Sequence, residues 1–347
     1  MSLYDSKTYL DDLRLTIEKN KEIFDALRNR SVLVTGASGA VCSPVVDLLL
    51  FSDRNIKVYA AGRNREKMDR RFVRWTDDPH YCFVSYDATK KNQLDFSADY
   101  VIHGASNSAP TDISSHGIET MLDNFMGTYE LLNYAEIHKC QNFLYISSSE
   151  VYGRKTDPAP FTEDEYGWVD ILNPRSYYPT SKRAAETMCA CFSQERHVKT
   201  TVVRPGHIYG PTAGRRDTHV ADAFAYRAAD GKDLVMNSAG KQLRSWCYSI
   251  DCASAILTVL VRGKEACAYN ISNRSGIASI RDMAELLAGE AGVRVMVHAV
   301  QQDSRQVNPM DNSSLNAEKL EQLGWQGLYS AATGFAHTIK IIREGNL

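Results

Sequence analysis

Short apolar runs alternate with longer amphipathic stretches through the first two hundred residues of the chain. Six of these runs have the length of buried strands: 31–34, 56–61, 81–86, 100–103, 142–147 and 199–204. Between them, apolar positions recur near the helical period, most clearly at 118–138 and 178–193. Strands that alternate with helices in this way are typical of a doubly wound parallel sheet. The pattern therefore predicts an α/β fold.

The pattern changes on both sides of this region. Residues 1–29 carry apolar side chains at helical spacing, which predicts a helical extension packed on the body of the protein or on a second subunit. Beyond residue 204 the alternation weakens into a mixed region. We predict three parts: the extension at 1–29, a sheet domain at 30–204, and a smaller mixed lobe at 205–347 that mainly binds substrate.

Composition and charge exclude several classes of partner. The 347 residues are 44% hydrophobic, and 40 basic against 42 acidic residues give a net charge of −2. We therefore expect no global attraction to nucleic acid or to an anionic membrane surface. The first residues are too polar for a secretory signal, and no apolar run is long enough to span a bilayer, so we expect a cytoplasmic protein without a membrane partner.

The eight cysteines and nine histidines show no metal-ligand spacing. We expect no metal site and cysteines that are reduced and mostly buried.

A glycine turn joins the first predicted strand to the helix that follows it. Gly36, Ser38, Gly39 and Ala40 lie in this turn, where glycine lets the backbone approach a pyrophosphate whose charge is met by the amides of a helix N-terminus. This position predicts dinucleotide binding by the domain at 30–204. At the third glycine position of such turns the chain has Cys42, which should slightly loosen the packing of helix on strand.

Four side chains after the fifth predicted strand form a candidate catalytic group. Tyr178 and Lys182 are four residues apart, so they share one face of a helix, where the ammonium can favour the ionised phenol. A tyrosine needs such help to act as a base near neutral pH, because a free phenol has a pKa of about 10. Ser148 could hold the same substrate oxygen, and Glu150 adds a carboxylate two residues later.

Together, the glycine turn and this group resemble the extended short-chain dehydrogenase/reductase family, the NAD-dependent epimerases and dehydratases that modify nucleotide sugars. The resemblance covers most of the chain, from Ser31 to about Trp325. It implies a Rossmann-like fold, NAD as cofactor, a nucleotide-diphosphate sugar as substrate, and a homodimer formed through helices such as 118–138 and 178–193.

The resemblance also implies further cofactor contacts: Asp87, Ala88, Ala105, Ser106, Pro205, Tyr178 and Lys182. The second strand ends without the acidic residue that binds the ribose of NAD. Arg63 stands there instead and could face the 2′-phosphate of NADP, so NADP is the alternative cofactor; a solvated basic loop is the other interpretation of this stretch.

Substrate contacts implied in the same way are Ser149, Arg175, His207, His219 and Arg244, together with a loop at 154–176 that faces the substrate. Arg244 lies in a segment that resembles the one whose arginine binds the sugar diphosphate, a ligand that suits a guanidinium. His207 and His219 stand where the family tends to have asparagine and arginine, so the nucleotide or sugar could differ.

The choice of reaction depends on Glu150. The family's shared first step oxidises a sugar carbon, usually C4, and an additional carboxylate is needed to move a proton at C5. The segments 148–150 and 165–187 resemble those of UDP-glucuronate decarboxylases and of some 4,6-dehydratases. We therefore predict a lyase of one of these two kinds. A sugar 4-epimerase is the alternative enzyme, a non-catalytic NAD(P)-sensing protein is the alternative of another class, and Glu150 could instead cap nearby backbone.

Overall fold

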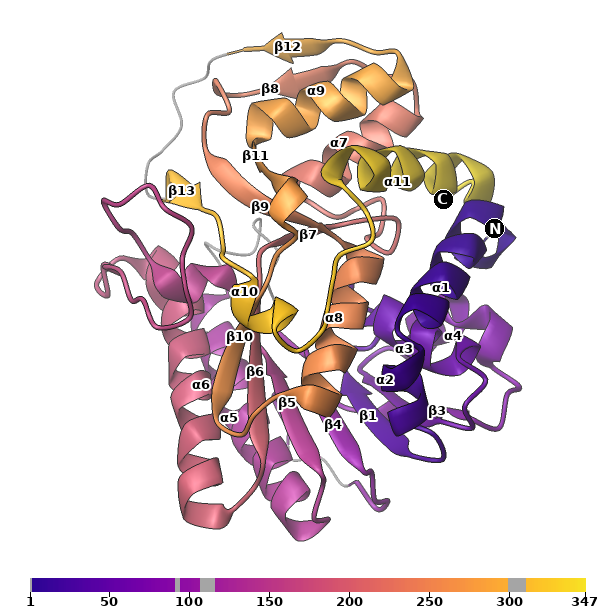
Figure 1. Ribbon diagram of the computed structural model, residues 1–347, viewed down its shortest axis with the longest axis vertical. Helices are drawn as coiled ribbons and strands as arrows, with labels where there is room; N and C mark the ends of the chain where they lie inside the picture. Colours follow the sequence, from indigo (N-terminus) through magenta and orange to yellow (C-terminus); the bar gives the residue numbers. More distant parts are fainter. Residues whose placement is uncertain (1, 91–93, 107–115, 299–309) are drawn as a thin grey trace.

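A seven-stranded parallel sheet forms the centre of the computed structural model, which describes residues 2–90, 94–106, 116–298 and 310–347 (Figure 1). Its strands are β1 (Ser31–Thr35), β2 (Lys57–Gly62), β3 (Tyr81–Ser85), β4 (Tyr100–His103), β5 (Asn142–Ile146), β6 (Thr200–Pro205) and β10 (Cys267–Ile271). They lie in the order β10-β6-β5-β4-β1-β2-β3, so the direction of winding reverses between β1 and β4. The predicted doubly wound sheet is confirmed, and its six predicted strands agree with the structure to within one residue at each end.

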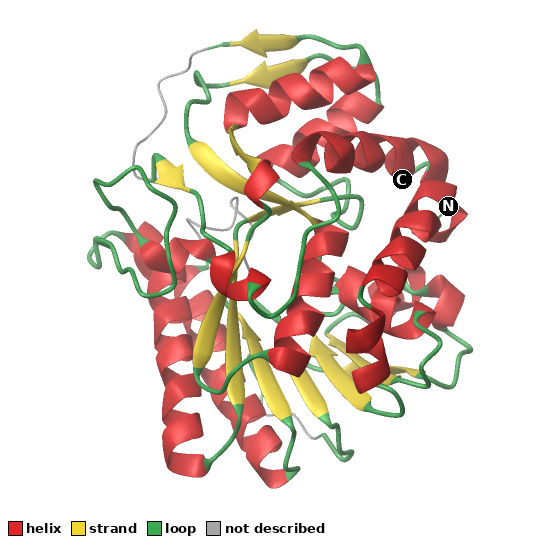
Figure 2. Cartoon of the chain, in the orientation of Figure 1, coloured by secondary structure: helices red, strands yellow, loops and turns green. Residues whose placement is uncertain are grey.

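Alternating side chains of each strand bury themselves on opposite faces of the sheet. In β1, Val32 and Val34 belong to one hydrophobic cluster, and Leu33 between them belongs to the other. Figure 2 shows helices on both faces of the sheet. Helices α3 (Ser43–Phe51) and α8 (Ser249–Arg262) are among those that supply the first cluster, whereas α5 (Gly117–Ile137) and α6 (Tyr177–Arg196) supply the second.

The C-terminal region contributes to the central sheet as well as to a separate lobe. Strand β10, which the sequence analysis did not predict, pairs with β6 in parallel register from Cys267 against Thr201 to Ile271 against Pro205. Helix α8 packs against β5 and β6. The region at 205–347 therefore completes an edge of the central sheet and covers part of one of its faces.

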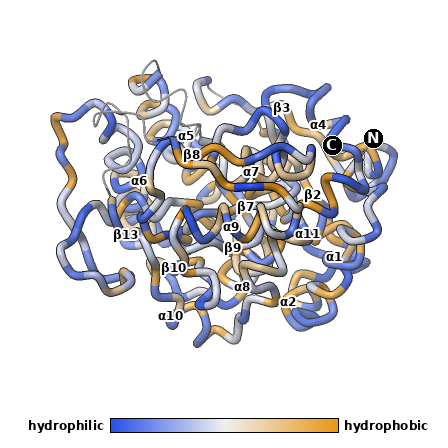
Figure 3. The backbone as a smooth tube through the Cα atoms, turned by 90° about the horizontal axis from the view of Figure 1, so that it is seen from above, coloured by the Kyte–Doolittle hydropathy of each residue, from blue (hydrophilic) through white to orange (hydrophobic). Residues whose placement is uncertain are grey.

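The rest of this region forms the smaller mixed lobe. Its strands are β7 (His207–Tyr209), β8 (Leu234–Met236), β9 (Leu243–Tyr248), β11 (Ile277–Ser279), β12 (Val295–Val297) and β13 (Asn312–Ser313). Strand β9 pairs with β7, β11 and β13, and β8 pairs with β12. The helices packed beside them are α7 (Val220–Ala229), α9 (Ile280–Ala291) and α11 (Ala331–Gly345), and a short helix α10 (Glu318–Glu321) packs near β10. Seen from above, hydrophilic stretches gather along the outline of the molecule, and apolar stretches lie within it (Figure 3).

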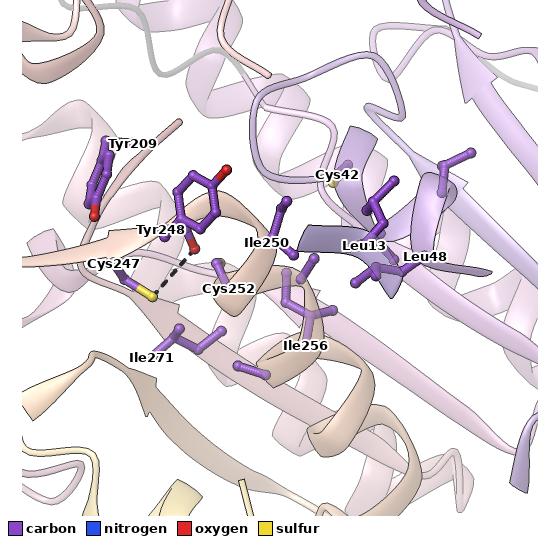
Figure 4. Close-up of a cluster of buried hydrophobic side chains, with 14 of the residues drawn as sticks. Leu13, Cys42, Leu48, Tyr209, Cys247, Tyr248, Ile250, Cys252, Ile256 and Ile271 are labelled. Atoms are coloured by element: carbon purple, nitrogen blue, oxygen red, sulfur yellow. Dashed lines mark hydrogen bonds between the residues drawn. The ribbon is translucent and has the colours of Figure 1, made fainter. Parts of the chain in front are cut away.

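The N-terminal extension packs on the body of the protein, one of the two predicted positions. Its helices are α1 (Lys7–Lys19) and α2 (Lys21–Ala26), and α1 contacts α3, α8 and α11. Figure 4 shows Leu13 of α1 beside Leu48 of α3 in the buried cluster that continues through Ile256 of α8.

Polar contacts fix the extension in place. Tyr4 and Tyr9 donate hydrogen bonds to the fully buried carboxylate of Asp47 in α3, at 2.6 and 2.5 Å. The same carboxylate forms an ion pair with Arg71, the last residue of helix α4 (Arg65–Arg71), whose Nη2 lies 2.5 Å from Oδ2 of Asp47. Ser6, just before α1, donates to Glu344 of α11 at 2.6 Å. The first helix of the chain is thereby attached both to the helix that follows the glycine turn and to the last helix.

All eight cysteines are free, and five of them are buried, in agreement with the prediction of reduced and mostly buried thiols. Within the described ranges, no helix combines the length and the apolar character that crossing a bilayer would require.

Candidate active site at the carboxyl ends of the strands

The glycine turn lies at the carboxyl end of β1, beside the point where the winding of the sheet reverses. Gly36 has a φ of +66°, and a Cβ at this position would lie 2.8 Å from the carbonyl oxygen of Gly104, so both conformation and space require glycine. Ser38, Gly39 and Ala40 continue the turn toward α3. The turn therefore brings backbone amides to the edge of the sheet where open α/β sheets bind ligands.

Cys42, at the third glycine position, is accommodated by a glycine on the neighbouring strand end. A Cβ on Gly104 would lie 2.3 Å from the Sγ of Cys42. The missing side chain at Gly104 therefore leaves room for the thiol, which is buried to 2% exposure. The loosening of helix on strand that the sequence predicts is in this way offset by a second residue.

Polar atoms left without protein partners surround the same edge. Ser106 after β4 and Ser147 after β5 each have a buried hydroxyl oxygen without a hydrogen-bond partner among the described residues. Buried polar atoms are normally satisfied, so such atoms indicate a place for a ligand. With the Gly36 turn, these two hydroxyls form a cradle that fits a dinucleotide cofactor lying across the strand ends. Ala105 and Pro205, at the ends of β4 and β6, lie along the same edge.

Arg63 and Asp87 lie close enough for the charge of one to act on the other. Burial alone would raise the pKa of Asp87, but hydrogen bonds from Thr89 hold it below its ordinary value, and Arg63 acts in the same direction. Arg63 follows β2, which neighbours β1, and Asp87 follows β3, the edge strand beside β2, with Ala88 directly after it. This places the predicted adenosine contacts on one side of the glycine turn.

Ser148 and Tyr178 meet in the structure. Ser148 ends the stretch that follows β5, Tyr178 lies in the first turn of α6, and the two hydroxyls form a hydrogen bond. Burial raises the pKa of the Tyr178 phenol, and the charge of Glu150 raises it further, whereas Ser148 and Arg175 lower it.

Lys182 lies one turn later on the same face of α6, with its Nζ 5.8 Å from the centre of the Tyr178 ring. It donates a hydrogen bond to the carbonyl oxygen of Ile146 at 2.8 Å, and burial lowers its pKa to about 8. The structure thus places Lys182 on the face of α6 that carries Tyr178, with its ammonium directed to the end of β5. His103, at the end of β4, is a packed core residue, as its position in the strand would suggest.

Glu150 forms a bidentate ion pair with Arg175. The Nη1 atom of Arg175 lies 2.6 Å from Oε2 of Glu150, and its Nη2 atom lies 2.8 Å from Oε1. The sequence analysis expects Arg175 to contact substrate, but the structure directs its guanidinium to this carboxylate. Ser149, between Ser148 and Glu150, is buried.

Arg244 approaches the same carboxylate from the smaller lobe. It lies in β9 with 4% exposure, and burial lowers its pKa to about 10 against the opposing charges of Glu150 and Asp311. His207 stacks edge-on against Trp246, with ring centroids 5.4 Å apart, and the charges of Arg244 and His219 act on it. Burial lowers the pKa of His207 to about 3, so this imidazole is neutral near pH 7. Of the predicted substrate residues of the lobe, Arg244 therefore lies within reach of the charge of Glu150, and His207 lies within reach of the charge of Arg244.

The structure reveals one cluster that the sequence analysis missed. Ligand atoms of Asp217, His219 and Asp222 lie within 4.8 Å of one another, at the start of α7. Two hydrogen bonds involve these side chains. Asp217 Oδ1 lies 2.6 Å from Nδ1 of His219, and Asp222 accepts a hydrogen bond from the backbone amide of Gly210 at 3.2 Å. The spacing Asp-x-His-x-x-Asp on a helix N-terminus is the signal that could have identified the group.

The segment that carries Glu150 is fixed to α6 by arginines. Arg183 donates to the carbonyl oxygens of Val151 and Gly167, at 2.6 and 3.1 Å. Arg204 of β6, 2% exposed, pairs with Glu186 of α6 at 2.6 Å. These bonds set the position of Glu150 relative to Tyr178 before any ligand is bound.

Comparison with known proteins agrees with this geometry. The model of the NAD dependent epimerase/dehydratase family matches residues 32–272. UDP-glucuronic acid decarboxylase 1 of Xenopus tropicalis is 27% identical over 91% of this chain and 72% of its own length. Among solved structures, the dTDP-glucose 4,6-dehydratase DesIV of Streptomyces venezuelae aligns with a TM-score of 0.77 at 23% identity, covering 91% of this chain and 98% of its own. The UDP-glucuronic acid 4-epimerase of Bacillus cereus aligns with a TM-score of 0.76 at 21% identity, covering 90% and 99%.

Proposed function

The chain belongs to the NAD-dependent epimerase/dehydratase family, and from this premise we propose that it is a nucleotide-sugar lyase acting through a transient 4-keto sugar. A UDP-glucuronate decarboxylase is the first candidate, since curated enzymes with this activity are similar to the chain over most of its length. A nucleotide-sugar 4,6-dehydratase is the second candidate.

The observation that carries the proposal is the position of Glu150. Simple 4-epimerisation needs an oxidising pair alone, whereas removal of carbon dioxide or water needs a further group that moves a proton at C5. Glu150 follows Ser148 by two residues, acts electrostatically on Tyr178, and is fixed by Arg175. Ser148, Tyr178, Lys182 and Glu150 are the proposed catalytic residues.

The roles of the protein groups follow from their contacts. NAD, when bound, supplies the hydride acceptor. Tyr178 takes the proton of the sugar hydroxyl as that carbon is oxidised, and Ser148 orients the hydroxyl. Lys182 would hold the nicotinamide ribose. After oxidation a 4-keto uronate would lose carbon dioxide, and the bonding electron pair would stay at C5. Glu150, having taken a proton from solvent, would deliver it to C5. Tyr178 would then return its own proton to the C4 oxygen as the hydride held by the reduced cofactor goes back to C4.

The charge of the pocket favours an anionic sugar. Arg175 is paired with the carboxylate of Glu150, whereas the buried Arg244 donates its hydrogen bond to the backbone carbonyl of Leu243. Arg244 is therefore the guanidinium proposed to bind a uronate or a diphosphate, ligands that suit its fork of donors.

The test is mass spectrometry of the products from a panel of nucleotide sugars headed by UDP-glucuronate, with NAD or NADP added. Loss of carbon dioxide supports the decarboxylase, and loss of water from a neutral hexose the dehydratase. A product of unchanged mass would establish a 4-epimerase and overturn the role of Glu150.

Tyr178→Phe distinguishes an enzyme from a cofactor-sensing protein. We expect turnover to fall by at least about a hundredfold, the range of a positioned general base, because phenylalanine cannot take the hydroxyl proton. Tyr129→Phe, on the exposed face of α5, is the matched control and should leave turnover unchanged. A Tyr178→Phe protein that keeps its biological effect would favour the sensor.

We also propose a homodimer that forms through α5 and α6. Leu122, Phe125, Met126 and Tyr129 are exposed at positions i, i+3, i+4 and i+7, which gives α5 a second apolar face in addition to its buried one. A groove beside them is lined by α6 residues including Met188 and Phe192. Apolar patches of this kind mark interaction sites.

Phe125→Glu should yield a monomer in sedimentation velocity, whereas Val73→Glu, an exposed position away from α5, should not. A dimer that survives Phe125→Glu would place the interface elsewhere.

We also propose a cytoplasmic location. Its support is the eight free cysteines, which suit a reducing compartment.

A further inference from the structure

Arg175 is held in a fixed position relative to both Glu150 and Tyr178. It lies in a short 3-10 helix, Pro174–Ser176, that continues directly into α6, and its amide donates to the side chain of Asn173 at 3.0 Å. Its side chain is 10% exposed, and both terminal nitrogens are directed to the two oxygens of Glu150. A bidentate fork of this kind fixes the plane of a carboxylate, which a single hydrogen bond does not.

Charged and titratable groups reach Tyr178 from several elements. They are Glu150 from the segment after β5, Arg175 and Tyr177 from the start of α6, Tyr145 from β5, and Lys182 one turn later. Glu150 and Arg175 act on the phenol with opposite signs. An unpaired Glu150 carboxylate would oppose ionisation of Tyr178, the step on which oxidation of the sugar depends.

We propose that Arg175 is a positioning residue: it fixes the plane of the Glu150 carboxylate and offsets the charge of that carboxylate beside Tyr178. This inference rests on the proposed function and deepens it. It separates Arg175 from Arg244, which donates a hydrogen bond to the backbone carbonyl of Leu243 and remains the proposed substrate contact. The proposal explains how one pocket can hold both a phenol that must lose a proton and a carboxylate that must act later.

The test follows the pH dependence of cofactor reduction in a single turnover with the substrate identified by mass spectrometry. In Arg175→Met, we expect the pH at half-maximal reduction to rise by about one unit, since loss of an opposite charge leaves Glu150 uncompensated. In Glu150→Gln the pH at half-maximal reduction should fall. In the double variant, which lacks both charges, this pH should be near the wild-type value, although each single substitution shifts it.

Arg175→Lys separates charge from geometry. Lysine keeps the positive charge and loses the fork, so the pH profile of reduction should stay near that of the wild type while complete turnover falls by about tenfold or more. An Arg175 that only binds substrate would instead raise KM in both variants without moving the pH profile. A double variant whose pH at half-maximal reduction stays as far above the wild-type value as that of Arg175→Met, or such a rise in KM alone, would overturn the proposal.

A second readout does not depend on activity. Crystal structures of Arg175→Met and Arg175→Lys should show the Glu150 carboxylate rotated out of the plane that it has in the wild type. An unchanged Glu150 in Arg175→Met would overturn the positioning role. If no nucleotide sugar reduces the cofactor, the proposed function fails while this crystallographic comparison still decides the role of Arg175. If Arg175→Met does not fold, the lysine variant and the double variant provide the same comparisons.

Discussion

Two arginine–carboxylate pairs in this protein have similar hydrogen-bond lengths and different surroundings. Asp47 pairs with Arg71 at 2.5 Å and also accepts hydrogen bonds from Tyr4, Tyr9 and Trp75. Donors from three parts of the chain therefore occupy its two carboxylate oxygens. Its side chain has no exposure. Glu150 pairs with Arg175 at 2.6 Å, and 21% of its side chain is exposed.

The difference separates a structural pair from one suited to chemistry. A carboxylate whose oxygens are filled from every side stabilises the elements around it and has no room for a ligand. A carboxylate that is oriented by an arginine and partly exposed keeps its plane and can still contact a substrate. An arginine–carboxylate pair can therefore be structural or suited to chemistry, depending on the groups that surround it. Four predictions test this contrast.

Asp47→Ala should have the largest effect of the four variants, a loss in the free energy of unfolding. Arg71 would be left as a buried charge without its partner, and breaking such a pair costs about 3–5 kcal/mol of the free energy of unfolding. Urea denaturation measures the loss, and kcat of the protein that remains folded should be close to that of the wild type. A variant that is as stable as the wild type, or one that is stable and inactive, would remove the contrast.

Glu150→Gln should have the opposite profile. We expect complete turnover to fall about 10²–10³-fold, because the amide cannot move the C5 proton, while substrate still reduces the bound cofactor. The free energy of unfolding should change by less than at Asp47, since glutamine can still accept from Arg175. Glu285→Gln, on the exposed side of α9, is the control. Full turnover in Glu150→Gln would contradict the assignment.

The pair of Asp12 and His337 is intermediate, with side-chain exposures of 5% and 31%. The hydrogen bond that the His337 imidazole donates to the Asp12 carboxylate holds the pKa of His337 above its ordinary value, against burial. The stabilisation is therefore complete below the unfolded pKa of about 6.5 and is lost as pH rises through the higher folded pKa. His337→Gln should flatten this part of the stability profile, which lies above the unfolded pKa of about 6.5. A decline of equal slope in the variant would exclude His337 as its source.

The smallest effect is expected at the surface pair Arg281–Glu285, one helical turn apart in α9 with both side chains at least half exposed. Replacing either by alanine should change the free energy of unfolding by about 0.3–0.5 kcal/mol, the usual value for such pairs. A loss of 2 kcal/mol or so, on the order of a buried pair, would show that burial does not explain the ranking.

Much of the sheet is predictable from the sequence because its physical cause is local. Each of the six predicted strands is an apolar run bounded by polar turns, and the spacing of Tyr178 and Lys182 places them on one helical face whatever surrounds the helix. Strand β10 is not predictable in this way, because it contains the polar residue Asn270. The side chain of Asn270 accepts a hydrogen bond from Tyr152 and donates one to the carbonyl of Phe161, both more than a hundred residues earlier.

The partners of the charges in the site were not predictable for a related reason. Arg175 and Glu150 are 25 positions apart, and the carbonyl that receives Lys182 is 36 positions before it. The sequence shows that these side chains gather at one edge of the sheet, but tertiary packing decides which of them pair. The directions of Arg175 and Lys182 therefore came from the structure alone.

The contact between Ser6 and Glu344 has a consequence for the order in which the chain assembles. During synthesis from the N-terminus, α1 emerges more than three hundred residues before the helix that carries Glu344, so its docking site is incomplete for most of that time. A contact of such separation is also among the slowest to close in a refolding chain. We expect α1 to be the last helix to gain protection from hydrogen exchange during refolding, after the sheet it covers has already formed.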